Sequence, residues 1–238
     1  SPTPAFDTTK PLSLRQIMKI SPLGCVGMFL TGGVFAAQFG MAAVYGSEVG
    51  LSVAQISTFV ASFYIGAMLV QYPLGWVSDR MDRRKLIAGV SLMTGIGALI
   101  GMVFGANFWM LLVAAFLVGG TSNPLYSLLI AYTNDFLEHD DMAAAAGGMV
   151  FINGLGAIAG PILVGWMMGA MGPGGYFLYM AVLMFMLVGY AIYRMTQRAA
   201  PSVSETDSYT PVSFSSSPMA VEFAQDYAIE TAQEAQTD

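Results

Sequence analysis

The sequence has little charge. Only 10% of its 238 residues are Asp, Glu, Lys or Arg, whereas an ordinary soluble domain has about 25%. Nine Lys and Arg stand against fifteen Asp and Glu, so the chain lacks the basic excess that nucleic-acid binding requires. The composition therefore excludes a soluble globular domain, and no nucleic acid is expected as a partner.

Cysteine and histidine are almost absent. The one cysteine, Cys25, excludes an intramolecular disulfide framework, and the one histidine, His139, excludes a multi-histidine site. The uncharged segments described below also hold no carboxylate pair that could serve catalysis. We therefore expect no metal, no cofactor and no enzymatic activity.

Long uncharged runs take the place of charge. Hydrophobic residues make up 55% of the chain, and its mean hydropathy is +0.63. Asp, Glu, Lys, Arg and His are absent from 20–47, 49–78, 86–134 and 142–193. A membrane-spanning helix needs about 20 apolar residues. The first two runs therefore hold one span each, and each of the last two holds two spans joined by a turn. The sequence predicts an all-α membrane protein with six spans, near 22–44, 53–77, 86–106, 108–132, 143–168 and 174–193.

The basic residues indicate the orientation. Six spans put both termini on one side of the membrane, and all nine Lys and Arg then fall on that side, whereas Glu48 lies opposite. The positive-inside rule makes that side cytoplasmic. We therefore expect residues 1–20 to end a cytosolic linker, 21–198 to form the six-helix domain, and 199–238, which hold seven acids and no base, to form a disordered cytosolic tail. The chain begins at Ser1 instead of Met, and we expect it to be part of a longer protein.

Side-chain amides occur in predicted spans one, two, four and five but not in three and six. They are Gln38, Gln71, Asn123 and Asn153, and their placement repeats after three spans. One interpretation is that these amides hold helices together through hydrogen bonds. The other is that spans one, two, four and five line a polar cavity in a 3+3 inverted repeat.

Two further patterns predict moving parts. The loop after span two reads GWVSDRMDRRK from Gly75 to Lys85, in which four of the six positions after Asp79 are basic. Such a loop is typical of a latch that pairs with opposite charges in one conformational state, or of an ordinary positive-inside loop. Span five contains Gly156, Gly160 and Pro161, a pattern that favours close packing or bending of the helix.

The loop resembles the signature of the major facilitator superfamily, G-x-x-x-D-R-x-G-R-R-K. Matching residues are Gly75, Asp79, Arg80, Arg83, Arg84 and Lys85, whereas Asp82 stands where the pattern has glycine. The span-five pattern resembles the G-x-x-x-G-P motif of the same family. The stretch from Tyr45 to Lys85 is similar to the C-terminal half of YcaD-like bacterial members.

The resemblance implies a secondary transporter of twelve spans, of which this chain is the C-terminal six-helix half. It implies a small-molecule substrate bound near mid-membrane, a missing N-terminal half as partner, a bacterial inner-membrane location and alternating access. By that analogy, the expected latch is Gly75, Asp79, Arg80, Arg83, Arg84 and Lys85, and the expected helix-flexing motif is Gly156, Gly160 and Pro161. The substrate-binding candidates come from the position of each residue around its helix and from its polarity, not from any family motif. They are Gln38, Tyr64, Asn123, Tyr126 and Asn153.

The alternative is a six-span scaffold or sensor that binds partners through its acidic tail. We also expect the acidic segment 134–141 to face the basic loop of the missing half.

Overall fold

The computed structural model describes residues 12–197. The predicted tail at 199–238 and most of the predicted linker at 1–20 therefore lie outside the described residues. The helices are α1 Leu14–Ile20, α2 Pro22–Phe35, η1 Ala36–Met41, α3 Ala42–Glu48, α4 Val53–Ser78, α5 Arg83–Phe104, α6 Phe108–Asn134, α7 His139–Met171 and α8 Gly175–Gln197. Here η1 is one π-helical turn that continues α2 into α3, so the three segments form a single rod.

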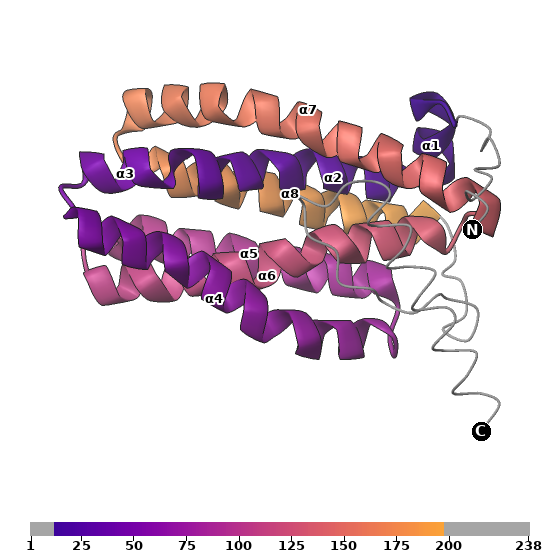
Figure 1. The fold of residues 1–238 in the computed structure, drawn as a ribbon, viewed down its shortest axis with the longest axis horizontal. Helices are drawn as coiled ribbons and strands as arrows, with labels where there is room; N and C mark the ends of the chain where they lie inside the picture. The colour runs from indigo at the N-terminus through magenta and orange to yellow at the C-terminus, as the bar shows by residue number, and fades with distance from the viewer. Residues whose placement is uncertain (1–11, 198–238) are drawn as a thin grey trace, which may run out of the picture.

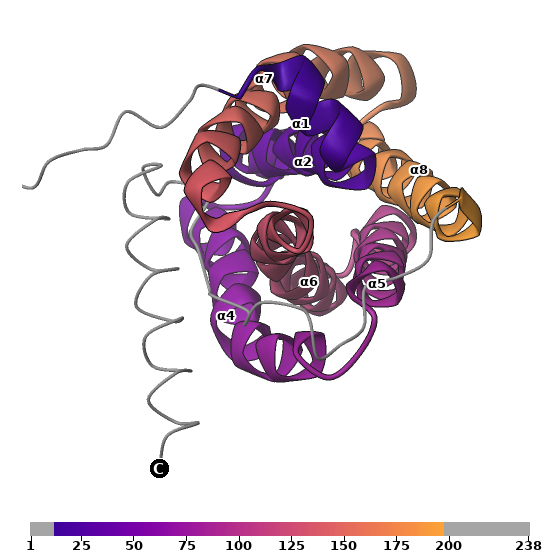
Figure 2. The ribbon, with the colours of Figure 1, turned by 90° about the vertical axis from the view of Figure 1, so that its right-hand side faces the viewer.

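Six of these rods are long and apolar enough to cross a membrane. Within 12–197 they are Pro22–Glu48, Val53–Ser78, Arg83–Phe104, Phe108–Asn134, Asp141–Met171 and Gly175–Gln197. Six spans were predicted, and their ends agree with the sequence-based boundaries to within a few residues. The rods run side by side along the long axis of a bundle (Figure 1), and the view down that axis shows them grouped closely together (Figure 2). The chain is a multi-pass membrane protein.

Local sequence sets where the rods begin and turn. Ser52 and Gln55 form a capping box at the start of α4, and the side chain of Asn107 accepts hydrogen bonds from the first turn of α6. The turns that precede α4 and α8 contain Gly50 (φ 76°) and Gly172 (φ 78°), which adopt a left-handed conformation that glycine tolerates best. The two longest uncharged runs were predicted to fold back once each, and the chain turns at 105–107 between α5 and α6 and at 172–174 between α7 and α8.

The rods differ in how deeply they are buried. The first span and α6 are the most buried of the six, whereas α4 and α7 are the least buried. The first span packs mainly on α7 and α8, and α6 packs mainly on α4 and α5. The helices α5 and α8, which are spans three and six, also pack closely on each other.

Glycines let two pairs of rods approach backbone to backbone. A Cβ atom on Gly156 of α7 would collide with the carbonyl oxygen of Phe29 on α2, and one on Gly32 would collide with that of Asn153. On the other side of the bundle, Gly66 of α4 and Gly119 of α6 lie equally close to the opposing backbone. Because lipid tails are as apolar as the helices, such close packing is a main source of attraction between spans.

A short helix that the sequence did not predict precedes the first span. Ser13 and Gln16 form a capping box at the start of α1, and Ile17 is fully buried. The Ile17 side chain lies against Gly148 of α7. The segment 14–20 therefore packs on the bundle at the end where α8 also finishes (Figure 1).

Replacement of Gly156 by alanine tests the backbone contact between α7 and α2. The added Cβ must push α2 away from α7, and overpacking of this kind costs about 1–3 kcal/mol of stability. The matched control is Gly154→Ala on the same helix, where a Cβ meets open space and alanine's helix propensity adds up to about 1 kcal/mol. The measurement is thermal unfolding of the full-length protein in detergent. Equal melting temperatures for the two variants would show that the contact is not tight.

Candidate functional site

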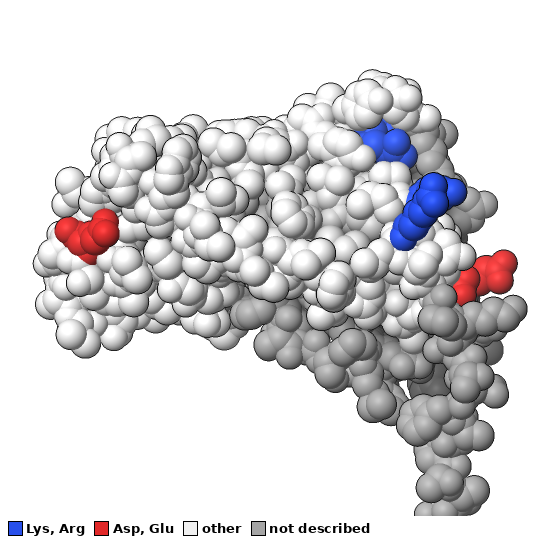
Figure 3. Space-filling model, turned by 90° about the horizontal axis from the view of Figure 1, so that it is seen from above, with Lys and Arg blue, Asp and Glu red and all other residues white. Residues whose placement is uncertain are grey.

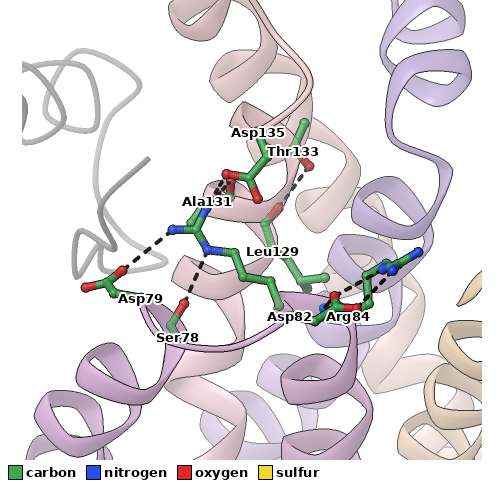
Figure 4. A network of polar contacts seen from close by, with 9 residues as sticks. Ser78, Asp79, Asp82, Arg84, Leu129, Ala131, Thr133 and Asp135 are labelled. Carbon is green, nitrogen blue, oxygen red and sulfur yellow. Dashed lines mark hydrogen bonds and ion pairs between the residues drawn. The ribbon is translucent and has the colours of Figure 1, made fainter. Parts of the chain in front are cut away.

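The signature loop is anchored by one buried arginine. Arg83, at the start of α5, forms an ion pair with Asp135 at the end of α6, and both side chains are only 2% exposed. Arg83 also donates to the carbonyl oxygen of Ala131 (3.2 Å) and the hydroxyl of Ser78 (3.3 Å), and its guanidinium lies 3.6 Å from Asp79. Figure 4 shows Ser78, Asp79, Ala131 and Asp135 around the same guanidinium group. The arrangement ties the ends of α4 and α6 to the start of α5.

The side chain of Asp82 caps the start of α5. Its carboxylate accepts from the backbone N–H of Arg84 (3.0 Å) and from that residue's Nε (3.1 Å) and Nη2 (2.8 Å), as Figure 4 shows. Burial raises the pKa of Asp82, but the hydrogen bonds from Arg84 and the charges of Arg84 and Lys85 outweigh it and leave that pKa below its usual value. The backbone of Asp82 has a φ of −56°, so this turn does not need the glycine of the family pattern.

Arg80 and Lys85 lie on the outer surface of the loop. Arg80 lies over the ring of Trp76 (4.1 Å from guanidinium carbon to centroid) and donates to that residue's carbonyl oxygen (2.9 Å). Lys85 is exposed, whereas Gly75 is buried in the last turns of α4. A groove of about 550 Å³ runs along this end of α4, lined by Met68, Gln71, Tyr72, Gly75, Trp76, Asp79 and Arg80. Of the six predicted latch residues, Arg83 forms the internal anchor and Arg84 pairs with Asp82. Gly75, Asp79 and Arg80 line the groove, and Lys85 lies outside it.

A second cluster lies near the middle of the bundle. The Gln38 amide, in the π-helical turn η1, donates to the hydroxyl of Ser122 on α6 (2.6 Å). One turn further along α6, the ring of Tyr126 lies 6.1 Å from that of Phe35 between centroids. Single π-helical turns within α-helices occur frequently at functional sites.

Aromatic rings continue from this cluster to the surface of α4. Phe35 lies 5.9 Å from Phe39, and Phe39 lies 5.1 Å from Tyr64, between ring centroids. Tyr64 is 51% exposed, whereas Tyr126 is 1% exposed. We call Tyr64, Phe39, Phe35 and Tyr126 the aromatic row. It brings together two of the predicted substrate-binding residues, and Gln38 adds a third beside it.

The remaining two candidates lie elsewhere. Asn153 on α7 donates to the carbonyl oxygen of Met28 on α2 (3.0 Å), which is the helix-bridging role of an intramembrane amide. Asn123 donates to the carbonyl oxygen of Gly119 in its own helix (3.0 Å). In the span-five motif, Gly156 and Gly160 lie against α2, and α7 remains helical through Pro161. Bending at this motif stays a prediction.

Sequence reasoning missed three features of these clusters. It did not foresee the π-helical turn, the part that Phe35, Phe39 and Ser122 play, or the partner of Arg83. It assigned Asp135, with the rest of 134–141, to an interface with a missing half, but Asp135 is buried against Arg83 within this bundle. The sequence did hold a signal for this ion pair. Asp135 at the end of span four and the basic loop 79–85 lie on the same predicted side of the membrane.

Substitution of Arg83 by glutamine tests the anchor. It leaves the buried carboxylate of Asp135 without a cationic partner, and loss of one member of a buried ion pair costs about 3–5 kcal/mol. The control Lys85→Gln changes an exposed cation in the same loop and is expected to shift stability by no more than about 0.5 kcal/mol. Thermal unfolding in detergent measures both, and adding Asp135→Asn to Arg83→Gln is expected to restore part of the loss. If Arg83→Gln unfolds like the wild type, the ion pair does not hold the loop.

Asp82 is tested by comparing three replacements. Alanine removes the helix cap and is expected to destabilise the protein by about 1 kcal/mol, whereas asparagine retains a capping oxygen and loses less. Glycine, the residue of the family pattern, costs only a few tenths of a kcal/mol as a cap, so it is expected to lie between the two. The same unfolding measurement ranks them. Alanine as stable as asparagine would contradict the capping role.

Known proteins resemble the chain in sequence and in fold. The sequence profile described as Major Facilitator Superfamily matches residues 24–225. The MFS-type transporter YfkF of Bacillus subtilis is 29% identical over 174 residues, which are 70% of this chain and 43% of that protein. The MFS-type transporter YcaD of Escherichia coli is 26% identical over 164 residues, which are 69% of this chain and 41% of that protein.

Two solved structures have the same fold. An auto-inhibited peptide transporter of the POT family matches 84% of this chain and 39% of its own, with a TM-score of 0.63 and 16% identity. The POT family transporter PepTSo matches 80% of this chain and 39% of its own, with a TM-score of 0.65 and 17% identity. The chain thus spans about 40% of the length of the relatives and structures it matches. Signature loop, six-helix bundle and matched profile agree: this chain belongs to the Major Facilitator Superfamily, a family of transporters and not of enzymes.

Proposed function

We propose that the chain is the C-terminal half of a secondary transporter that moves a small solute across the bacterial plasma membrane by alternating access. The observation that carries the proposal is a six-helix bundle whose signature loop is anchored on Arg83 while one side of the same loop faces an open groove. The similarity of Tyr45–Lys85 to the C-terminal half of YcaD-like proteins favours the second half over the first.

Helix neighbours support an inverted repeat of three spans. In such a repeat, spans one, two and three correspond to spans four, five and six. The packed pair α2 and α7 (spans one and five) then corresponds to the packed pair α6 and α4 (spans four and two). In the same way, the contact of α2 with α8 corresponds to that of α6 with α5. The glycine contacts follow the same correspondence, since one backbone-to-backbone approach occurs in each pair. Rocking of such repeats against a second half is the usual basis of alternating access.

The charge distribution supports cytoplasmic termini. Arg15 and Lys19 on α1, the loop 79–85 and Arg194 on α8 all lie at one end of the bundle, and Glu48 lies at the other. The face in Figure 3 shows charge only at its two ends, with a broad uncharged band between them. A band of this kind matches the hydrocarbon core, and the basic end matches the cytoplasmic leaflet.

The missing N-terminal half would cover the faces of α4 and α7. These two spans carry a large share of the exposed apolar side chains, among them Met68, Tyr72 and Trp76 on α4 and Ile158, Ile162 and Trp166 on α7. Asp79, whose side chain is 39% exposed, contacts Arg83 on one side and lines the groove on the other. A latch at this point would therefore sense the position of the second half through Asp79 and Arg80.

Transport by the full-length protein tests the proposal. Proteoliposomes are incubated with a bacterial metabolite extract, and their contents are compared by mass spectrometry with those of protein-free liposomes. We expect at least one solute to accumulate, and Asp79→Asn to slow its flux by about fivefold or more because the loop loses the charge that couples the two halves.

The control for this experiment is Arg15→Gln, which changes an exposed charge on α1, outside both the signature loop and the groove. It is expected to transport like the wild type. Absence of any protein-dependent accumulation would refute the transporter assignment. Equal flux by Asp79→Asn and the wild type would refute the latch role of the loop.

A further inference from the structure

The aromatic row leads from an exposed side chain to an enclosed one near mid-membrane. Its outer ring, Tyr64, belongs to α4, one of the faces that the proposed second half would cover, and its inner ring, Tyr126, is fully enclosed. Neighbouring centroids lie 5.1, 5.9 and 6.1 Å apart, with interplanar angles of 34°, 48° and 40°. Ring pairs at these separations attract one another, and a further flat ring is attracted in the same way.

Polar atoms without partners accompany the row. Among the described residues, neither the hydroxyl of Tyr126 nor Oε1 of Gln38 has a hydrogen-bond partner, and both side chains are enclosed. Only one polar atom of the Gln38 amide is used, by Ser122, so the other stays unpaired whichever way the amide is turned. An unpaired buried polar group is costly, and in a binding protein a ligand is one means of satisfying it.

The π-helical turn accounts for how these groups come together. In η1 the backbone is wider than in an α-helix, and Gln38 and Phe39 are consecutive residues of this turn. Gln38 contacts Ser122 of α6, while Phe39 contacts Tyr64 of α4. A single turn of the first span thereby presents a polar group and a ring to two different helices.

We propose that this half binds the flat, uncharged ring portion of its solute against Tyr64 and Phe39, with a polar substituent directed to Tyr126 and Gln38. The inference rests on the proposed function and names the substrate class: compounds with a planar aromatic ring and a neutral hydrogen-bonding group. No Asp, Glu, Lys, Arg or His lies in the four uncharged runs of the sequence, so this wall offers no counter-ion for a charged ring.

Two matched compounds test the role of the ring. Benzamide and cyclohexanecarboxamide carry the same neutral amide on a flat and on a puckered ring. Binding of each radiolabelled compound to the full-length protein is measured by scintillation proximity. We expect benzamide to bind about threefold to tenfold more tightly, as the strength of aromatic pairing predicts.

Variants assign the preference to the row. Tyr64→Leu keeps apolar bulk but removes the ring, so it is expected to abolish the preference for benzamide. The control Tyr193→Leu removes a tyrosine of similar exposure on α8 (55% against 51%) and is expected to leave the preference intact. Tyr126→Phe removes only the hydroxyl and is expected to weaken both compounds about twofold to tenfold, the effect of one hydrogen bond.

The outcomes separate this inference from the proposed function. Failure of benzamide to bind up to its solubility limit, equal affinity for the two compounds, or a preference that survives Tyr64→Leu would each overturn the inference. Flux of other solutes in the proteoliposome experiment would then still support a transporter. Loss of the preference in Tyr64→Leu with retention in Tyr193→Leu supports the aromatic row as the binding wall.

Discussion

Hydrocarbon offers no hydrogen-bond partner to a peptide group, and this constraint underlies the whole structure. Every backbone group in a span must be satisfied within its own helix, so the chain crosses the membrane only as continuous helical rods. Once the rods are formed, the surrounding lipid is as apolar as their side chains, and burial alone no longer drives them together. Close approach at Gly32, Gly66, Gly119 and Gly156 supplies the contact that burial cannot.

The same constraint divides the polar groups by depth. Charged pairs such as Arg83 with Asp135 lie at the end of the bundle, where the loop adjoins the interface. The middle contains neutral groups only: an amide, hydroxyls and aromatic rings. A protein built this way keeps strong electrostatic contacts at the loop between spans two and three, where a change of state could be registered. In the proposed transporter, the mid-membrane wall then offers weaker, shape-dependent contacts, which suit a solute that must bind and leave.

The sequence predicted the spans well because the positions of charged residues along the chain can be read without knowledge of the fold. Where Asp, Glu, Lys and Arg are absent for 28 residues or more, the helix between them follows from membrane thickness. The loop signature was equally readable. Of the five substrate-binding candidates, Gln38, Tyr64 and Tyr126 lie together, whereas Asn123 and Asn153 each donate to a backbone carbonyl elsewhere in the bundle. Their role in binding a substrate stays a prediction. A π-helical turn shifts the helix rotation midway along the first span, and the partner of Arg83 lies 52 residues away, so neither follows from local pattern.

Labelling of single cysteines in the full-length protein tests the six-span arrangement most directly. Cys25→Ala removes the buried native cysteine of this chain, and the same protein without an added cysteine gives the background labelling. Cysteines at Glu48, Lys85 and Thr196, all exposed, then probe the two ends of the bundle. With a membrane-impermeant maleimide on intact cells, the account predicts labelling at Glu48→Cys alone, and labelling at the other two sites only after permeabilisation. Labelling of Thr196→Cys and Glu48→Cys from the same side would contradict it.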